Sequence, residues 1–381
     1  MILKTLDGVN LKNKNVLLRT DFNVPIKNGI IVDDFRIKES LNTIKFLLRA
    51  GVNRIFIMSH FGRPKGVQEE FKMDVIAKKL YKLSGRSIQK IDDLIFDSYD
   101  FESKIVLLEN LRFFEGEEKN SEDFAKKLAS LADIYVNDAF GVCHRKHASV
   151  HAITKFLPSY AGLLVQKEVE VFDEVLNASD RPLTAILGGS KLETKIPVIK
   201  NLITRVDNLL IGGGMIFTFY SAKGYNVGRS LVDHQNKTLV KMLLNNDVLK
   251  IPRDVIIADE KDNPTQILNV TPDKIPTFMM GLDIGKKTFE EFKKILSSSK
   301  LIVWNGPLGY YENDLFAHHT NELMKYLASL DAKVVIGGGD TAAIVEKLGL
   351  KKHFYHVSTG GGASLKLLEG ETLPALEKLM K

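Results

Sequence analysis

The sequence has one cysteine, Cys143, so no disulfide can form within the chain. That usage fits a reducing compartment, and we expect a cytoplasmic protein. Long hydrophobic runs are also missing: the longest, LLIGGGMIFTFY (209–220), is too short and too rich in glycine to cross a bilayer. The first residues, MILKTLDGVNLKNK, lack the apolar core of a signal peptide. We therefore expect neither a disulfide framework nor a membrane span.

Low-complexity segments and tight internal repeats are absent as well, which argues against a disordered tail or a solenoid. What is present is an ordinary globular composition, 44% hydrophobic and 26% charged, over 381 residues. A chain of this length is sufficient for two domains with a large core.

The formal net charge of +6 raises the possibility of a nucleic-acid-binding protein. The lysines, however, are scattered as singles and pairs among acids, which is typical of a solvated mixed surface. Basic binding without catalysis remains an alternative, which steeply salt-dependent DNA binding would support. The arginines differ: eight of the twelve precede residue 165, and several follow predicted strands.

Short apolar runs rich in Val, Ile and Leu alternate with helical patterns along the whole chain. Runs that are apolar at every position, rather than at every second one, suit a parallel sheet covered on both faces. We therefore predict two α/β domains with parallel sheets. The predicted strands lie within 15–20, 53–60, 104–111, 133–140, 182–189, 206–213, 254–260, 300–306, 333–339 and 354–361.

A domain boundary is predicted after the Pro-Ser break at 158–159. A long amphipathic helix over 162–177 follows it and ends in the polar stretch NASDRP. This helix is expected to join a first domain, 1–161, to a second domain, 178–363. In the first domain, a helix is also expected to start at Ser121, where SEDFAKKL has a capping pattern.

Polar residues follow the strands of the first half, where ligands bind in open parallel sheets. Several arginines converging from separate strand ends would repel one another unless an anion lay among them. Their planar forks bind phosphate or carboxylate in bidentate fashion, so we expect a ligand with more than one charged group. Asp21 and Asn23 would contact its hydroxyls. The set is Arg19, Asp21, Asn23, His60, Arg63, Arg112 and Arg145, with Arg36 at a helix start.

Three histidines in HRKHASVH, at 144, 147 and 151, have near-helical spacing. A zinc site would require further ligands, but no cysteine or carboxylate stands at ligand spacing. The intervening Arg-Lys pair is also unfavourable for a cation. We expect histidines that are satisfied by the protein or that face substrate.

A glycine run followed by a helix, GGGDTAAIVEKLG at 337–349, marks the second half. The bare backbone of Gly337, Gly338 and Gly339 and the helix start offer N–H donors to an anion. Thr341 adds a hydroxyl and an amide. Asp340 beside phosphates is a candidate magnesium ligand. The pattern indicates a polyphosphate site.

Lys191 and Lys195 in GGSKLETKIP would lie near another glycine-rich helix entrance. Pro197 is tolerated only in a first turn, which predicts a helix start near Thr194. In WNGPLGYYE, Asn305 lies in a rigid turn and Glu312 is a candidate acceptor for ribose hydroxyls.

Two familiar motifs compete with this interpretation. GGGDTA fits the dinucleotide fingerprint, but the acid expected about 20 residues later is missing. GLDIGKKT departs from a P-loop in its glycine spacing. An NAD-dependent dehydrogenase remains the alternative, and tight NADH binding without competition from MgADP would favour it.

Nine motifs, in order along the chain, resemble the phosphoglycerate kinase family. They are RTDFNVP, SHFGRP, ENLRF, DAFG with a following HR.H, GGSKLETKI, GGGMIFTF, WNGPLGYYE, GGGDT and STGGGASL. The resemblance implies two Rossmann-like domains joined by a hinge helix. It also implies reversible transfer of phosphate from 1,3-bisphosphoglycerate to ADP, giving 3-phosphoglycerate and ATP with Mg2+, by a monomer.

The resemblance also assigns roles. The acidic substrate is held by residues matching Asp21, Asn23, Arg36, His60, Arg63, Arg112 and Arg145, while Arg19 is expected to be structural or to support the residues that contact the ligand. The nucleotide is held by residues matching Lys191, Lys195, Gly212, Gly213, Asn305, Glu312, Gly337, Gly338, Gly339, Asp340 and Thr341. Arg36, Lys191 and the amides of Gly339 and Gly362 are implied to act on the moving phosphoryl group. The C-terminal tail, 364–381, is implied to return to the first domain.

Overall fold

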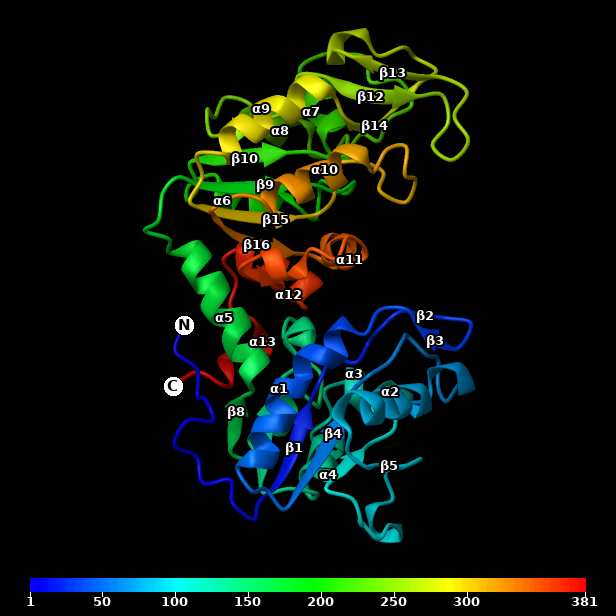
Figure 1. Cartoon of the computed structure of the whole chain (residues 1–381), viewed down its shortest axis with the longest axis vertical. Helices are drawn as coiled ribbons and strands as arrows, with labels where there is room; N and C mark the ends of the chain where they lie inside the picture. The colour runs from blue at the N-terminus through cyan, green and yellow to red at the C-terminus, as the bar shows by residue number, and fades with distance from the viewer. The chain divides into compact units, whose positions relative to one another are not determined.

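The computed structural model describes residues 1–381, and the chain divides into two compact units. Unit 1 comprises Met1–Glu170 and Thr372–Lys381, and unit 2 comprises Val171–Glu371. Each unit contains a six-stranded sheet whose neighbouring strands all run parallel, with helices against it (Figure 1). The predicted α/β class, with a parallel sheet in each half, is confirmed. None of the helices combines the length and apolar content that spanning a bilayer requires.

The limits of the two compact units differ from the predicted domain limits. Helix α5 (Leu163–Leu176) corresponds to the predicted helix over 162–177, and the division falls within it. The returning tail begins at Thr372 rather than at residue 364, because helix α12 (Gly361–Leu368) packs against β16 and α6 of unit 2.

The sheet of unit 1 has the strand order β5-β6-β4-β1-β7-β8. The strands are β1 (Asn15–Arg19), β4 (Arg54–Met58), β5 (Ile88–Lys90), β6 (Ile105–Leu107), β7 (Ile134–Asn137) and β8 (Ser159–Ala161), with a small hairpin of β2 (Ile26–Lys27) and β3 (Ile30–Ile31). The helices are α1 (Phe35–Arg49), α2 (Asp74–Ser84), α3 (Glu115–Glu118), α4 (Glu122–Ala129) and α13 (Pro374–Glu377), with 3-10 turns η1 (Glu69–Phe71), η2 (Phe96–Ser98), η3 (Leu111–Phe113), η4 (Phe140–Val142) and η5 (Ala152–Lys155).

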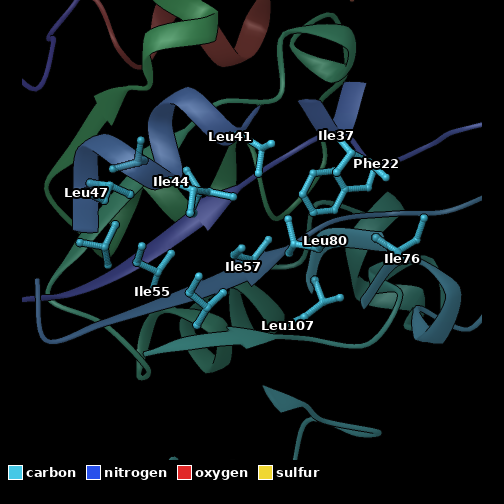
Figure 2. Packing of buried hydrophobic residues seen from close by; sticks show 14 of the residues in the cluster. Phe22, Ile37, Leu41, Ile44, Leu47, Ile55, Ile57, Ile76, Leu80 and Leu107 are labelled. Atoms are coloured by element: carbon cyan, nitrogen blue, oxygen red, sulfur yellow. The ribbon is translucent and has the colours of Figure 1, made fainter. Parts of the chain in front are cut away.

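Successive residues of the unit 1 strands pack into two different clusters. Leu18 and Ile57 pack with the apolar face of α1, as the sticks in Figure 2 show for Ile57. Their neighbours Leu17 and Phe56 belong to a second cluster, which includes Leu128 of α4. Because side chains alternate across a strand, burial in both clusters requires apolar residues at every position. This explains the continuous runs in the sequence.

The N-terminus of α4 is capped as predicted. The side chain of Ser121 accepts a hydrogen bond from the amide of Phe124. An N-cap hydroxyl of this kind satisfies one of the amides that a helix start leaves without a partner. At its C-terminus, helix α2 is followed by the C-cap residue Gly85, whose φ of 64° is a left-handed conformation that glycine tolerates.

The main sheet of unit 2 has the order β11-β10-β9-β15-β16-β17. Its strands are β9 (Leu183–Leu187), β10 (Asn208–Ile211), β11 (Leu249–Lys250), β15 (Leu301–Asn305), β16 (Lys333–Gly337) and β17 (His356–Val357). The remaining helices are α6 (Ile196–Leu202), α7 (Ile216–Ala222), α8 (Lys237–Leu243), α9 (Lys286–Leu296), α10 (His318–Leu327) and α11 (Gly339–Lys347), with turns η6 (Pro272–Lys274) and η7 (Lys351–His353).

One predicted parallel strand, within 254–260, was placed in the wrong sheet. It forms β12 (Val255–Ala258), which pairs antiparallel with β13 (Ile267–Val270) and β14 (Met280–Ile284) in a separate three-stranded sheet. Val255, Ile257 and Ala258 are buried, so the run looks the same in sequence as a parallel core strand. An apolar run reports burial but not the direction of its partner.

Candidate active site

The carboxyl edge of the unit 1 sheet gathers the predicted polar residues. Asp21 follows β1, and its Oδ2 lies 3.3 Å from Nη1 of Arg36 at the start of α1. The same guanidinium donates to the carbonyl oxygen of Asn23 at 2.9 Å. His60 follows β4, with Nδ1 3.9 Å from Oδ1 of Asp21. Adjacent parallel strands end at the same edge, which brings these separated positions together.

Guanidinium groups of several arginines lie near His60, and Nη2 of Arg19 contacts its Nδ1 at 3.3 Å. The pKa of His60 is held well below its usual value, mainly by burial of the ring. The positive charges of nearby arginines lower it further; these are Arg19, Arg112, Arg36 and Arg145. Four guanidiniums therefore act on one imidazole, which stays neutral at physiological pH. Such a concentration of positive charge is suited to an anionic ligand.

Arg112 is fixed in this cluster by its neighbours. It lies in η3 after β6, donates from Nη1 to the carbonyl oxygen of Gly62 at 2.5 Å, and pairs with Glu118 at 3.2 Å. Burial and the charge of Arg145 lower the pKa of Arg112. Asn23 contributes to the same wall, since its Oδ1 accepts from the amide of Gly62 at 2.9 Å.

Two of the predicted arginines differ from the rest. Arg63 is exposed, and no contact joins it to the other members of the cluster. Arg19 is only 1% exposed and uses its guanidinium on protein atoms, as expected of a structural residue. Nε donates to Oγ of Ser149 at 2.7 Å, and Nη2 lies 3.8 Å from Oε1 of Glu117.

The three histidines of the HRKHASVH segment lie among protein partners. Nε2 of His144 accepts from Nε of Arg145 at 3.3 Å, and Nδ1 of His147 lies 3.8 Å from Glu117. Burial and nearby arginines lower the pKa of His147 to about 4. His151 contacts Nδ2 of Asn120 at 3.2 Å. Each imidazole thus has a different polar neighbour.

In unit 2, two helix N-termini lie side by side. Helix α11 begins at Gly339 after Gly338, whose φ of 93° favours glycine. Helix α12 begins at Gly361, and a Cβ there would lie 3.3 Å from the amide nitrogen of Gly339. The first amides of a helix have no partner within it and carry partial positive charge. Two such ends together form a seat for an anion.

Asn305 and Lys195 stand beside this seat. Asn305 ends β15 and is buried; its Oδ1 accepts from Nζ of Lys195. Its Nδ2 is buried without a hydrogen-bond partner and would be 3.2 Å from a Cβ at Gly337. Burial lowers the pKa of Lys195 to about 8. A buried amide without a partner requires an explanation. A ligand oxygen that accepts a hydrogen bond from Nδ2 would provide one.

A cavity of about 440 Å³ reaches the first turn of α11 at Asp340. Asp340 and Glu312 lie on its polar side, and the backbone of Gly213 forms part of its wall. Apolar side chains line the remainder, which suits the flat face of an aromatic ring. These are Ile216, Phe217, Leu231, Met280, Leu282, Pro307 and Leu308.

A family model decides the identity. The model described as phosphoglycerate kinase matches residues 6–371. The chain belongs to the phosphoglycerate kinase family.

Curated relatives and solved structures agree with this membership. The chain is 44% identical to phosphoglycerate kinase of Dictyoglomus turgidum, over 97% of this chain and 96% of the relative. It is 45% identical to that of Thermosynechococcus vestitus, over 98% and 97%. The phosphoglycerate kinase structure from Coxiella burnetii is 36% identical, covers 99% of this chain and 98% of its own, and gives a TM-score of 0.87.

As a phosphoglycerate kinase, the protein is a phosphotransferase with a carboxyl group as acceptor. The family reaction moves a phosphoryl group reversibly between 1,3-bisphosphoglycerate and ADP, giving 3-phosphoglycerate and ATP in glycolysis. The GGGDTA glycines lie inside the matched kinase region, so the dehydrogenase alternative is set aside.

Several residues predicted for the nucleotide site have a different position or exposure from the one expected. Helix α6 begins at Ile196 with Lys195 at the N-cap, two positions after the predicted start near Thr194, and Pro197 lies in its first turn as expected. Lys191 is exposed, and so is Gly362 in the first turn of α12. No contact joins either of them to Asn305 or Asp340. Thr341 is buried, and its hydroxyl accepts from the amide of Gly306 at 2.8 Å.

Other residues that line the cavity in unit 2 were not predicted from the sequence. Arg229 and Lys261 line it, as does Tyr311, whose pKa is raised by burial and by Asp340. Tyr311 directly precedes Glu312, so its position in the motif was a usable signal. Arg229 and Lys261 follow no main-sheet strand, and nothing local distinguishes them from surface charges.

The residues beside Asp340 suit a nucleotide-bound Mg2+ rather than a metal held by protein alone. No group of three or more His, Cys, Asp or Glu side chains is positioned for a metal ion. Asp340 is an exposed carboxylate in the first turn of α11, next to amides that suit phosphate. Mg2+ usually keeps several waters and takes one or two carboxylates plus substrate phosphates, which fits this set.

Proposed function

We propose that unit 1 binds 3-phosphoglycerate and 1,3-bisphosphoglycerate, and that unit 2 binds ADP and ATP. The contact of Arg19 with His60, together with the charges of Arg36, Arg112 and Arg145 near the same imidazole, carries the first assignment. The paired starts of α11 and α12 beside the unsatisfied amide of Asn305 support the second. The acidic substrate contacts Asp21, Asn23, Arg36, His60, Arg63, Arg112 and Arg145; the nucleotide contacts Lys191, Lys195, Gly212, Gly213, Asn305, Glu312, Gly337, Gly338, Gly339, Asp340 and Thr341.

Transfer is direct and in line, without a phosphoenzyme. Phosphoryl transfer requires positioning and neutralisation of charge rather than covalent help from the protein. Arg36 and Lys191, together with the amides of Gly339 and Gly362, neutralise the charge on the moving group. No side chain of the proposed set is assigned to attack the phosphoryl group.

Asp340 holds the magnesium ion of MgADP and MgATP. When bound, the ion screens the phosphate charges and orients the terminal phosphoryl group. Asn305 and Lys195 lie beside the same helix ends and contact the phosphates from the other side.

The two substrates bind to different units, so a productive complex requires the units to close on each other. Closure also excludes water, which otherwise competes as a phosphoryl acceptor. Helix α5 and the segment 357–365 are the candidate pivots. We propose that the enzyme works as a monomer in the cytoplasm, as the family resemblance implies.

A coupled assay with 3-phosphoglycerate and MgATP tests the activity. We expect ADP formation that depends on both substrates and, in the reverse direction, ATP from 1,3-bisphosphoglycerate and MgADP. Rapid quenching after incubation with labelled ATP alone should show no protein-bound phosphate. Labelled protein formed at the rate of turnover would contradict direct transfer.

Asp340→Ala should raise the Kd of MgATP by about tenfold, because one carboxylate ligand of the metal is lost. The Kd of ATP without Mg2+ should stay unchanged or fall, since a negative charge near the phosphates is removed. Calorimetric titration with and without Mg2+ separates the two effects. Glu346→Ala, a change of another acid on α11, is the control. Equal MgATP affinity in Asp340→Ala and the wild type would remove Asp340 from the site.

Nucleotide affinity should fall as the pH rises above 8. Burial lowers the pKa of Lys195 to about 8, so its charge is present below that pH and is lost above it. Because bound phosphate favours the charged amine, the Kd of MgATP should rise by about fivefold from pH 8 to 9 and by nearly tenfold per pH unit above that. Lys195→Arg keeps its charge and should flatten this dependence, whereas Lys200→Arg on the same helix should not. An unchanged slope in Lys195→Arg would refute the assignment.

A further inference from the structure

His60 is a neutral imidazole at the centre of the unit 1 cluster, and its ring can carry its proton on either nitrogen. The choice decides whether the ring offers a ligand a donor or an acceptor. We propose that Arg19 is a positioning residue that fixes His60 as the Nε2–H tautomer, so that His60 donates a hydrogen bond to the acidic substrate. The donation from His60 to the acidic substrate rests on the proposed function of unit 1.

The contact between the two side chains fixes the tautomer. Nη2 of Arg19 lies 3.3 Å from Nδ1 of His60. A guanidinium stays protonated in proteins and can only donate. Nδ1 must therefore accept, and the single proton of the neutral ring is carried by Nε2.

Asp21 is the one competing partner that would favour the opposite tautomer. Its Oδ1 lies 3.9 Å from Nδ1 of His60, which is too far for a hydrogen bond. Its other oxygen is engaged with Arg36 at 3.3 Å. The charged groups that act on the ring include Arg19, Arg36, Arg112 and Arg145, so protonation at both nitrogens is disfavoured as well.

Arg19 cannot rotate away from His60, because its other nitrogens are held. Nε donates to Oγ of Ser149 at 2.7 Å, and Nη1 donates to the carbonyl oxygen of Thr20. Ser149 is fixed in turn, since its hydroxyl donates to Oε1 of Glu117 at 2.6 Å and its amide donates to Oε2 at 3.0 Å. A buried chain from Glu117 through Ser149 and Arg19 thus sets the proton on His60.

Nε2 is the free end of this chain. No hydrogen bond within the protein engages it. A donor at this point favours a ligand oxygen that accepts, such as a carboxylate, hydroxyl or phosphate oxygen, and disfavours a ligand that can only donate there.

Long-range 1H–15N spectra of enzyme with 15N-labelled histidine test the tautomer directly. The His60 signals are assigned by their absence in His60→Gln. We expect the Nε2–H pattern from about pH 6 to 8, without the shift of an imidazolium. An Nδ1–H pattern, or a charged ring at pH 7, would overturn the proposal without requiring any Arg19 variant to fold.

Arg19→Lys provides the second measurement, since lysine keeps the charge but cannot make the three directed contacts. We expect the Nδ1–H tautomer to become populated. The KM for 3-phosphoglycerate should rise by about tenfold, the effect of one lost hydrogen bond, while kcat changes by less than about threefold. Arg54→Lys, at a half-buried arginine on β4 that donates to two carbonyl groups, is the control. A folded Arg19→Lys with the native tautomer would contradict the proposal.

Adding 3-phosphoglycerate separates this inference from the proposed function. A shift of the His60 Nε2–H signal on titration places the ring at the substrate. If the tautomer is as expected but the signal does not respond, the tautomer assignment stands while the role of His60 in binding fails.

Discussion

Arg36→Ala should lower kcat by roughly three orders of magnitude, because arginines that neutralise a moving phosphoryl group contribute effects of this size. Arg36 is held near the substrate cluster by Asp21 and the carbonyl oxygen of Asn23, and its side chain remains 25% exposed, so its fork is accessible to a ligand. The Kd of MgATP should stay within about twofold of the wild type, since the nucleotide is assigned to unit 2. Steady-state kinetics and calorimetric titration give the two numbers.

Arg49→Ala is the matched control for this experiment. Arg49 ends the same helix and is exposed, so its loss should leave kcat nearly unchanged. Equal losses of turnover and nucleotide affinity in Arg36→Ala would contradict a role in the transfer step.

Gly213→Ala should be the most damaging small substitution in the nucleotide site. Gly213 has a φ of 71°, and a Cβ there would lie 2.4 Å from the amide nitrogen of Gly189. The atoms that this Cβ would meet are all backbone atoms of Gly189, so the collision is relieved only by moving the turns that line the cavity. We expect a loss of about 3 kcal/mol or more in the free energy of unfolding and a rise of at least about tenfold in the Kd of MgATP.

Gly224→Ala separates the collision from the cost of the left-handed backbone. Gly224 has a φ of 88°, and a Cβ there would meet nothing within 4 Å. Its replacement should cost about 1–2 kcal/mol and leave nucleotide affinity unchanged. Urea unfolding of both variants, with titration of the folded forms, makes the comparison. Similar stabilities would show that the contact with Gly189 is not restrictive.

The sequence was sufficient to predict the parallel strands and the residues at their ends. Continuous apolar runs are required when both faces of a sheet are buried, as Leu17 and Leu18 show by packing in opposite clusters. The carboxyl edge then follows from the direction of the strands, which is why Asp21, Arg36 and His60 were expected together. The strand β12 was misassigned because its partners, β13 and β14, carry weak apolar patterns with mostly exposed or half-buried residues.

Other features depend on contacts between distant parts of the chain. Arg19 and Arg112 both follow or end strands, yet one is buried against Ser149 and Glu117 while the other lies nearer the surface of the cluster. Sequence spacing does not encode that difference. Lys261 lines the cavity of unit 2 from outside the parallel sheet, so the rule for strand ends did not reveal it.

The return of the chain to its beginning has a consequence for biosynthesis. The amide of Lys4 donates to the carbonyl oxygen of Leu379, and the amide of Lys381 donates to that of Ile2, with Leu376 and Leu379 buried. The ribosome therefore completes the continuous segment of unit 2, Val171–Glu371, before it adds Thr372–Lys381, the last segment of unit 1. During translation, the half made first is the half completed last.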